Sequence, residues 1–244
     1  MTPKPPVDEF ALSPALDRGK LAARYAQAGR IHIPEVLAPE SAARLHRALS
    51  EETSYNLTVN SGEKYFDLPE AQVRALSPQQ LQALTDSAGA GTQKGFQLYY
   101  ETHRLSESGE PYRDPKSVLA KWVAFLESED FLSFVRDVTG EPSVAFADAQ
   151  ATRYGPGHFL TTHDDGIAGK NRVAGYVFNM TPFWQADWGG ILLFLDKDGQ
   201  VAEGFVPCFN ALNILKVPQP HLVSQVAPFA RAKRLSVTGW FRAR

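Results

Sequence analysis

The sequence predicts an α+β fold in which N-terminal helices pack on one sheet of a β-sandwich or barrel. Helical hydrophobic spacing dominates up to about residue 142, and short alternating segments fill residues 143–244. Clusters of Gly, Pro, Asn and Asp separate these segments, which is typical of a sandwich or barrel of many short strands. We therefore expect a single domain over 1–244, with a helical part over 1–142 and a sheet core over 143–244.

One strand and a helix are expected near the start of the chain. Residues 30–37 (RIHIPEVL) alternate between apolar and polar side chains, as a strand does. A helix should begin at Pro39, because Ala42, Leu45 and Leu49 recur at helical spacing.

Three more helices are expected before the sheet core. Ser77 and Gln80 form a capping box around Pro78, and a helix should follow. Residues 116–127 and 128–138 each carry an apolar stripe that predicts a buried helix face. The insert from 55 to 105 is rich in turn residues and could form a lid.

Seven strands are predicted in the C-terminal part. Each combines alternation or a short apolar run with flanking turn residues. They cover 143–154, 158–165, 172–180, 190–196, 211–217, 221–227 and 234–241.

Composition excludes several classes of function. The 244 residues carry a formal net charge of −2 and no lysine- or arginine-rich run, which excludes a nucleic-acid surface. Cys208 is the only cysteine, so no disulfide forms within the chain, as in proteins of a reducing cytoplasm. The N-terminus lacks the apolar core of a signal peptide, and no run of roughly 18 apolar residues is present to span a membrane. We expect a cytoplasmic protein without a membrane partner.

The stretch TTHDDGIAG contains the first candidate for chemistry. Side chains alternate along a strand, so His163 and Asp165 should converge on one face while Asp164 points away. One imidazole and one carboxylate are two of the three ligands of a non-haem Fe(II) facial triad. A bare His-x-Asp pair is usually a solvated turn, so the interpretation depends on a third ligand.

His221 is the preferred third ligand, because it opens a predicted strand far along the chain, after the turn VPQP. His158 remains an alternative, although it is close to His163 in sequence. His32 has no acidic partner nearby, His46 lies on a polar helix face, and His103 is a further candidate.

Arg234 provides a second, independent signal. Alternation places it on one face of a predicted strand with Ser236 and Thr238. A buried arginine is costly unless paired, and its guanidinium fork fits a carboxylate bidentately. An internal salt bridge would be the ordinary explanation. With the His-x-Asp pair and the distal histidine, an anchor for a dicarboxylic ligand is the better interpretation.

Together these residues resemble the Fe(II)/2-oxoglutarate-dependent oxygenase superfamily, and more narrowly its prolyl-hydroxylase-like branch. The match covers about residues 145–244. Further family features follow in order: Tyr154-Gly155-Pro156-Gly157, Arg172, Trp184, Trp188-Gly189-Gly190, Asn210-Ala211-Leu212 and the closing Ser236-Val237-Thr238-Gly239-Trp240-Phe241.

The resemblance implies a double-stranded β-helix, or jelly roll, with Fe(II) held by His163, Asp165 and His221. It implies 2-oxoglutarate and O2 as co-substrates, with ascorbate as a candidate accessory. Arg234 and Ser236 would anchor the C5 carboxylate of 2-oxoglutarate.

Three further residues take expected roles from the resemblance. Tyr154 would line the co-substrate pocket. The position of a tyrosine that helps to bind 2-oxoglutarate in many relatives falls near Asn179, which is a departure from the family pattern. Arg172 would either contact substrate or brace its strand.

The resemblance favours hydroxylation of a prolyl residue in a protein or peptide. A free amino acid or another small metabolite is the alternative substrate. Tyr99 and Tyr100 are candidates to line a substrate groove, together with Tyr55, Tyr65 and Phe66. A jelly-roll protein that binds metal without oxidising anything stays open as a different class, although it would have no need for Arg234.

Overall fold

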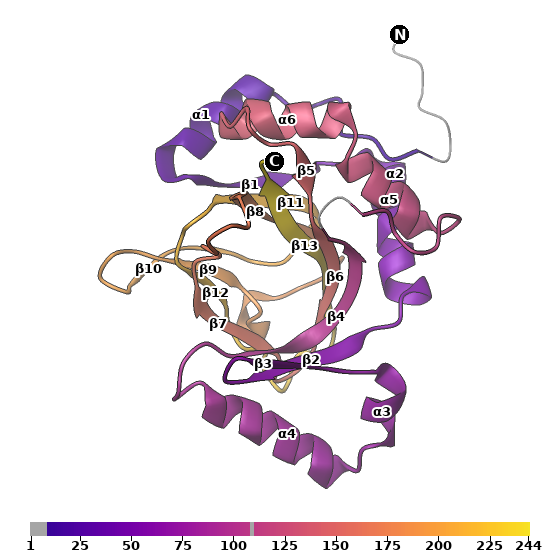
Figure 1. The fold of residues 1–244 in the computed structure, drawn as a ribbon, viewed down its shortest axis with the longest axis vertical. Helices are drawn as coiled ribbons and strands as arrows, with labels where there is room; N and C mark the ends of the chain where they lie inside the picture. Colours follow the sequence, from indigo (N-terminus) through magenta and orange to yellow (C-terminus); the bar gives the residue numbers. More distant parts are fainter. Residues whose placement is uncertain (1–8, 108–109) are drawn as a thin grey trace.

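The computed structural model describes residues 9–107 and 110–244, which form a nearly closed antiparallel barrel with helices around it (Figure 1). This is the expected double-stranded β-helix. The helices are α1 (Arg18–Ala28), α2 (Pro39–Arg47), α3 (Glu70–Ala75), α4 (Pro78–Gly91), α5 (Val118–Leu126) and α6 (Glu129–Thr139). A π-helical turn (Ala48–Glu52) extends α2, and a 3-10 turn covers Ala186–Trp188.

The strands follow one path around the barrel, in the order β1-β11-β8-β13-β6-β4-β7-β12-β9-β10, with the hairpin β2-β3 attached to β4. The two end strands are linked by an ion pair between Arg30 on β1 and Glu203 on β10, at 2.6 Å. The strands have these bounds: β1 Arg30–Pro34, β2 Asn56–Ser61, β3 Lys64–Leu68, β4 Leu98–Ser106, β5 Phe146–Ala147, β6 Ala149–Tyr154, β7 Phe159–His163, β8 Arg172–Met180, β9 Leu192–Leu195, β10 Val201–Phe205, β11 Phe209–Lys216, β12 His221–Val223 and β13 Arg234–Arg242.

Local signals explain where the helices begin and end. The hydroxyls of Ser117 and Ser128 accept hydrogen bonds from the first turns of α5 and α6, and such caps stabilise a helix by about 1 kcal/mol each. Gly140 ends α6 in the left-handed conformation. Ser77 and Gln80 form the predicted capping box at the start of α4.

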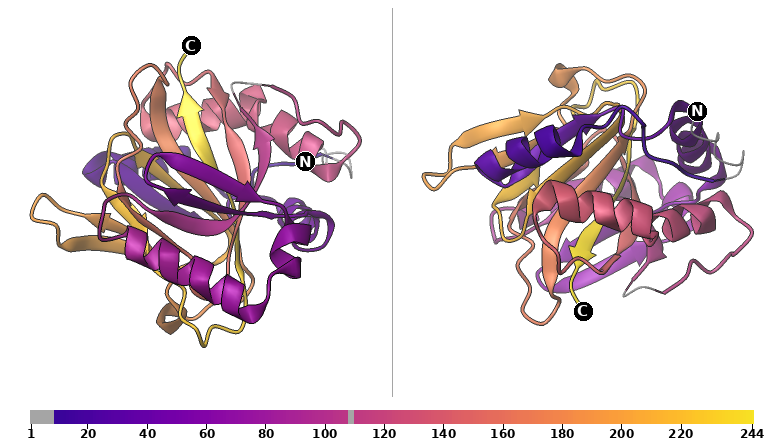
Figure 2. Two further views of the ribbon diagram at one scale, coloured as in Figure 1. Left: turned by 60° about the horizontal axis from the view of Figure 1, so that its bottom comes forward. Right: turned by 90° about the horizontal axis from the view of Figure 1, so that it is seen from above.

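Helices α1, α2, α5 and α6 cover the outer face of the sheet (Figures 1 and 2). The predicted apolar stripes are confirmed as core, since Trp122 and Phe131 are fully buried. They meet Phe178 of β8 edge-on and tilted, respectively, with ring centroids 4.9 and 5.8 Å away. The outer face of this part of the sheet is therefore a buried apolar layer.

The segment 55–105 differs most from expectation. It supplies β2, β3 and β4, and β4 pairs with both β6 and β7. The segment therefore contributes strand β4 to the barrel wall, with the hairpin β2-β3 paired to it. The segment is rich in turn residues because the hairpin β2-β3 and the helices α3 and α4 follow one another closely and need several connecting turns. Strand β10 was also not predicted, because its side chains are nearly all exposed and carry no alternation.

Candidate active site

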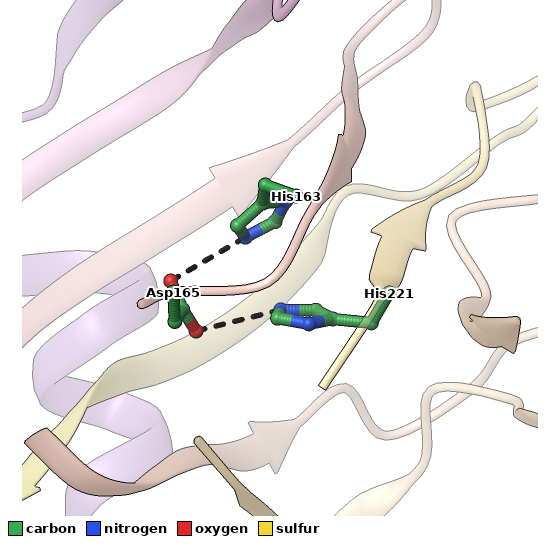
Figure 3. Close-up of side chains that lie close together, drawn as sticks. All are labelled: His163, Asp165 and His221. Atoms are coloured by element: carbon green, nitrogen blue, oxygen red, sulfur yellow. Dashed lines mark ion pairs between the residues drawn. The ribbon is translucent and has the colours of Figure 1, made fainter. Parts of the chain in front are cut away.

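His163, Asp165 and His221 form a compact cluster inside the barrel (Figure 3). His163 ends β7 and His221 opens β12, directly opposite it in the antiparallel register. Nε2 of His163 lies 3.6 Å from Oδ1 of Asp165, and Nε2 of His221 lies 3.5 Å from Oδ2. One ligand atom from each residue lies within 4.8 Å of the other two, which is a spacing that a single metal ion can bridge.

Asp165 reaches the cluster by a turn and not by strand alternation as predicted. Strand β7 ends at His163, and Asp165 adopts a left-handed backbone with φ 63°, which is uncommon for a residue other than glycine and is often found at functional sites. Asp164 is exposed, and its carboxylate accepts the backbone N–H of Gly166 at 2.9 Å. The convergence of His163 and Asp165 is confirmed, but the turn after β7, and not strand alternation, brings the two side chains together.

Backbone carbonyls fix the imidazole tautomers. Nδ1 of His163 lies 2.9 Å from the carbonyl oxygen of Thr161, and Nδ1 of His221 lies 2.7 Å from that of Gln219. A carbonyl only accepts, so each Nδ1 carries the proton and each Nε2 presents a lone pair toward Asp165. Burial, and then the neighbouring His163, lower the pKa of His221 and favour the neutral ring. Two imidazoles and one carboxylate on one side of a point fit an Fe(II) facial triad.

The alternative ligand His158 lies elsewhere. It is buried, its Nδ1 accepts the backbone N–H of Gly155 at 3.1 Å, and burial lowers its pKa to about 4. The other histidines also have local partners: His32 contacts Asn213, His46 the carbonyl of Met180, and His103 the carbonyl of Ser54.

Arg234 is buried at 1% exposure and faces the same cavity as the metal cluster. Nη1 donates to the carbonyl of Gly190 at 2.9 Å, and Nε has no hydrogen-bond partner in the described part of the chain. Within 9–107 and 110–244, no carboxylate forms an ion pair with it. The ordinary explanation, an internal salt bridge, therefore does not apply. Burial lowers the pKa of the guanidinium, so a bound carboxylate would offset an existing cost.

Ser236 and Asn179 do not line the cavity as the described residues define it. The hydroxyl of Ser236 is fully buried and lies 2.8 Å from that of Thr152. Asn179 is 1% exposed and is the register partner of Ser236, and neither of its amide atoms has a hydrogen-bond partner. Contact of these two side chains with the co-substrate stays a prediction.

The cavity has a volume of about 930 Å³ and two chemically different ends. The inner end is apolar and aromatic around Arg234, and its wall includes Tyr154, Tyr100, Leu192 and Val223. The outer end is polar and opens past the metal cluster; residues that sequence reasoning did not assign there are Asp67, Thr102, His103, Tyr112 and Gln150. The sequence did not predict these residues because they come from the hairpin β2-β3, from β4 and β6 and from a loop, and only the fold brings these segments together.

Two tyrosines predicted for the substrate groove separate onto opposite faces of β4. Tyr100 lines the cavity, whereas Tyr99 packs outside it against Phe159 and donates to or accepts from the hydroxyl of Thr85 at 3.0 Å. The prediction for Tyr99 is wrong, because neighbours on a strand point in opposite directions. Tyr55 is likewise fully buried, and its hydroxyl donates to the carbonyl of Leu49.

Arg172 lies between the metal cluster and the outer end. Its guanidinium carbon is 3.4 Å from the centroid of the Trp240 ring, and Nη1 donates to the backbone oxygen of Asp165 at 3.1 Å. The same Nη1 lies 3.9 Å from Oδ1 of Asp165. Arg172 therefore braces the loop that carries the carboxylate ligand while also lining the cavity.

No helix among the described residues is long and apolar enough to cross a bilayer.

Residues 149–242 match the family model of the 2OG-Fe(II) oxygenase superfamily. By sequence, no curated protein is similar enough to register as a relative. Solved structures show the fold at low identity. A Burkholderia pseudomallei oxidoreductase of the 2OG-Fe(II) oxygenase family is 14% identical with a TM-score of 0.62, over 96% of this chain and 95% of that one.

Two prolyl hydroxylases are similar to a comparable degree. A Pseudomonas putida prolyl-4-hydroxylase is 15% identical, with a TM-score of 0.57 over 93% of this chain and 100% of that one. A Trichoplax adhaerens prolyl hydroxylase, in complex with a hypoxia inducible factor oxygen degradation domain peptide fragment, is 12% identical. Its TM-score is 0.60, over 93% of this chain and 89% of that one. The chain therefore carries a 2OG-Fe(II) oxygenase domain at residues 149–242, which supports its assignment as a 2-oxoglutarate-dependent dioxygenase.

Proposed function

We propose that the chain hydroxylates a C–H bond of a prolyl residue in a protein or peptide, with Fe(II) held by His163, Asp165 and His221. The overall reaction converts R–H, 2-oxoglutarate and O2 into R–OH, succinate and CO2. Bound Fe(II) supplies the activation of O2 in this chemistry. The carbonyl-anchored Nδ1 atoms of both histidines support the assignment, because they direct the Nε2 lone pairs toward one point.

Arg234 is proposed to anchor the C5 carboxylate of 2-oxoglutarate, and Tyr154 to line that end of the cavity. The observation that carries the whole proposal is a buried arginine in the cavity of the metal cluster, with no carboxylate partner among the residues that the structure describes. A protein that only bound metal would bear the desolvation cost of this arginine for no purpose.

The outer end of the cavity is the proposed substrate site. Hydroxyl, amide and carboxylate groups of β2, β3, β4 and β6 line it, with the aromatic side chains of Tyr65 and Trp240. Tyr65 is 60% exposed, so an aromatic surface at the mouth is available to a polypeptide. The Trichoplax prolyl hydroxylase, solved with a peptide fragment, supports a peptide as the first substrate to try.

One catalytic unit is proposed for residues 1–244. Strands β1 and β4 come from the N-terminal part, and they pair with β11 and with β6 and β7 of the core. The proposed cytoplasmic setting rests on the composition of the sequence.

The test is succinate formation from 2-oxoglutarate by the Fe(II)-loaded protein, against proline-containing peptides and a panel of free amino acids. Stimulation by a peptide, with a mass gain of one oxygen on proline, is the expected result. Stimulation only by a free amino acid would replace the substrate assignment. Metal binding without any succinate would remove the oxygenase function.

A further inference from the structure

Arg234 belongs to a row of three side chains that crosses three adjacent strands. It is the register partner of Tyr154 on β6. On the other side of β6, Arg153 pairs with Glu101 of β4, so the next residues along, Tyr154 and Tyr100, also face each other. Tyr154 therefore lies between Arg234 and Tyr100, and all three line the cavity.

The side chains of this row are in contact. The rings of Tyr100 and Tyr154 stack with centroids 4.7 Å apart and an angle of 8° between the ring planes. The guanidinium carbon of Arg234 lies 5.1 Å from the centroid of the Tyr154 ring. None of the three is more than 7% exposed. A cation over a desolvated aromatic face is attracted by the negative face of the ring.

This contact stabilises the cation without using its hydrogen-bond donors. A carboxylate partner would neutralise Arg234 but would also occupy the fork that a ligand carboxylate needs. In the described chain Arg234 makes one hydrogen bond, to the carbonyl of Gly190, and contacts the face of Tyr154. The ring of Tyr100 stacks on the ring of Tyr154 and supports its orientation.

We propose that Tyr100 is a positioning residue for the co-substrate, acting through Tyr154 to hold the guanidinium of Arg234 ready for the distal carboxylate of a 2-oxo dicarboxylic acid. This inference rests on the proposed role of Arg234. It moves Tyr100 from the substrate groove, where the sequence placed it, to the inner end of the cavity.

The ring and the hydroxyl of Tyr100 have separable surroundings. Burial raises the pKa of Tyr100 to about 12; the Gln150 side chain acts in the opposite direction, and the charge of Asp165 raises the pKa further. The polar groups that act on the hydroxyl, Gln150 and Asp165, are not members of the stack. Removing the hydroxyl should leave the stack intact, whereas removing the ring should not.

The experiment is an anaerobic titration of the Fe(II)-loaded full-length protein with 2-oxoglutarate and, separately, with 2-oxobutyrate, which lacks the distal carboxylate. Tyr100→Leu should weaken 2-oxoglutarate binding about 2- to 10-fold, the usual range for one aromatic pair. Binding of 2-oxobutyrate should not change. Tyr100→Phe should bind both acids as the unmodified protein does. If Leu prevents folding, Tyr100→Met removes the same ring.

If Tyr100→Leu weakens the binding of both acids equally, the effect is merely structural and the inference is overturned. The inference is also overturned if the binding of neither acid is weakened. Tyr99→Leu is the matched control, because it removes a ring from the same strand on the opposite face; the ratio of the two affinities should stay constant. In an Arg234→Ala background, Tyr100→Leu should have no further effect on 2-oxoglutarate.

The two proposals fail in different ways. If Arg234→Ala leaves 2-oxoglutarate binding intact, the anchor in the proposed function is wrong. If Arg234→Ala weakens binding and Tyr100→Leu does not, the anchor stands and only the role of Tyr100 is overturned.

Discussion

His163 and His221 lie opposite each other on adjacent antiparallel strands, with ring centroids 4.2 Å apart. Burial, together with the neighbouring His163, lowers the pKa of His221 and makes protonation of that ring unfavourable. The carboxylate of Asp165 lies within 3.6 Å of both Nε2 atoms. The arrangement is therefore best explained by an ion that takes all three groups as ligands.

Replacing His221 by alanine should abolish Fe(II) binding and turnover while leaving the fold intact, because β12 keeps its backbone pairing with β7 and β9. Bound iron and succinate formation are the measurements. The control is Asp164→Ala, which removes an exposed carboxylate adjacent to the cluster. Wild-type activity in the His221 variant would refute the ligand assignment.

Replacing Arg234 by alanine should weaken 2-oxoglutarate binding and leave iron binding nearly unchanged. Loss of one partner of a desolvated charge pair costs roughly 2–5 kcal/mol, which is about 30- to several-thousand-fold in affinity. Arg234→Lys should be intermediate, since lysine keeps the charge and loses the fork.

The exposed Arg231 provides the control for that experiment. Arg231→Ala should bind 2-oxoglutarate normally in the anaerobic titration. If the effects of the two alanine variants are reversed, a different arginine holds the co-substrate.

Metal removal should lower the thermal stability of the protein. An ion that binds only the folded state stabilises it by about 2.7 kcal/mol at one hundred times its dissociation constant. A chelator should therefore reduce the melting temperature, and added Fe(II) under anaerobic conditions should restore it. The His163→Ala variant should show neither change; an equal response in that variant would place the stabilising ion elsewhere.

His158 should make the protein less stable as the pH falls from about 6.5 to about 4. Its folded-state pKa is about 4, against an ordinary value of 6.5, so between these values the unfolded chain takes up a proton that the folded chain excludes. The cause is burial, which the nearby Glu101 partly opposes. The loss is on the order of 3 kcal/mol and is complete below the folded pKa.

His158→Asn removes this titration and keeps an acceptor for the N–H of Gly155. Its free energy of unfolding, measured by urea denaturation at several pH values, should fall less than that of the unmodified protein across this window. Parallel pH profiles for the two proteins would contradict the prediction.

The sequence by itself determined the chemistry of this protein. His163, Asp165 and Arg234 are recognisable because each requires a particular residue type at a fixed local spacing, and strand periodicity and turn residues located all but one of the strands of the C-terminal half. Helix ends at Ser77, Ser117 and Gly140 are equally local, since capping depends on neighbouring backbone groups.

Only the tertiary structure decided which of several histidines joins the cluster and what surrounds Arg234. Register pairs His221 with His163 and leaves His158 in another environment, although His158 is closer along the chain. The contact of Arg234 with the Tyr154 ring joins strands far apart in sequence, and within 9–107 and 110–244 no carboxylate pairs with Arg234. Such contacts depend on which faces the barrel encloses, a long-range property that no local pattern of residues encodes.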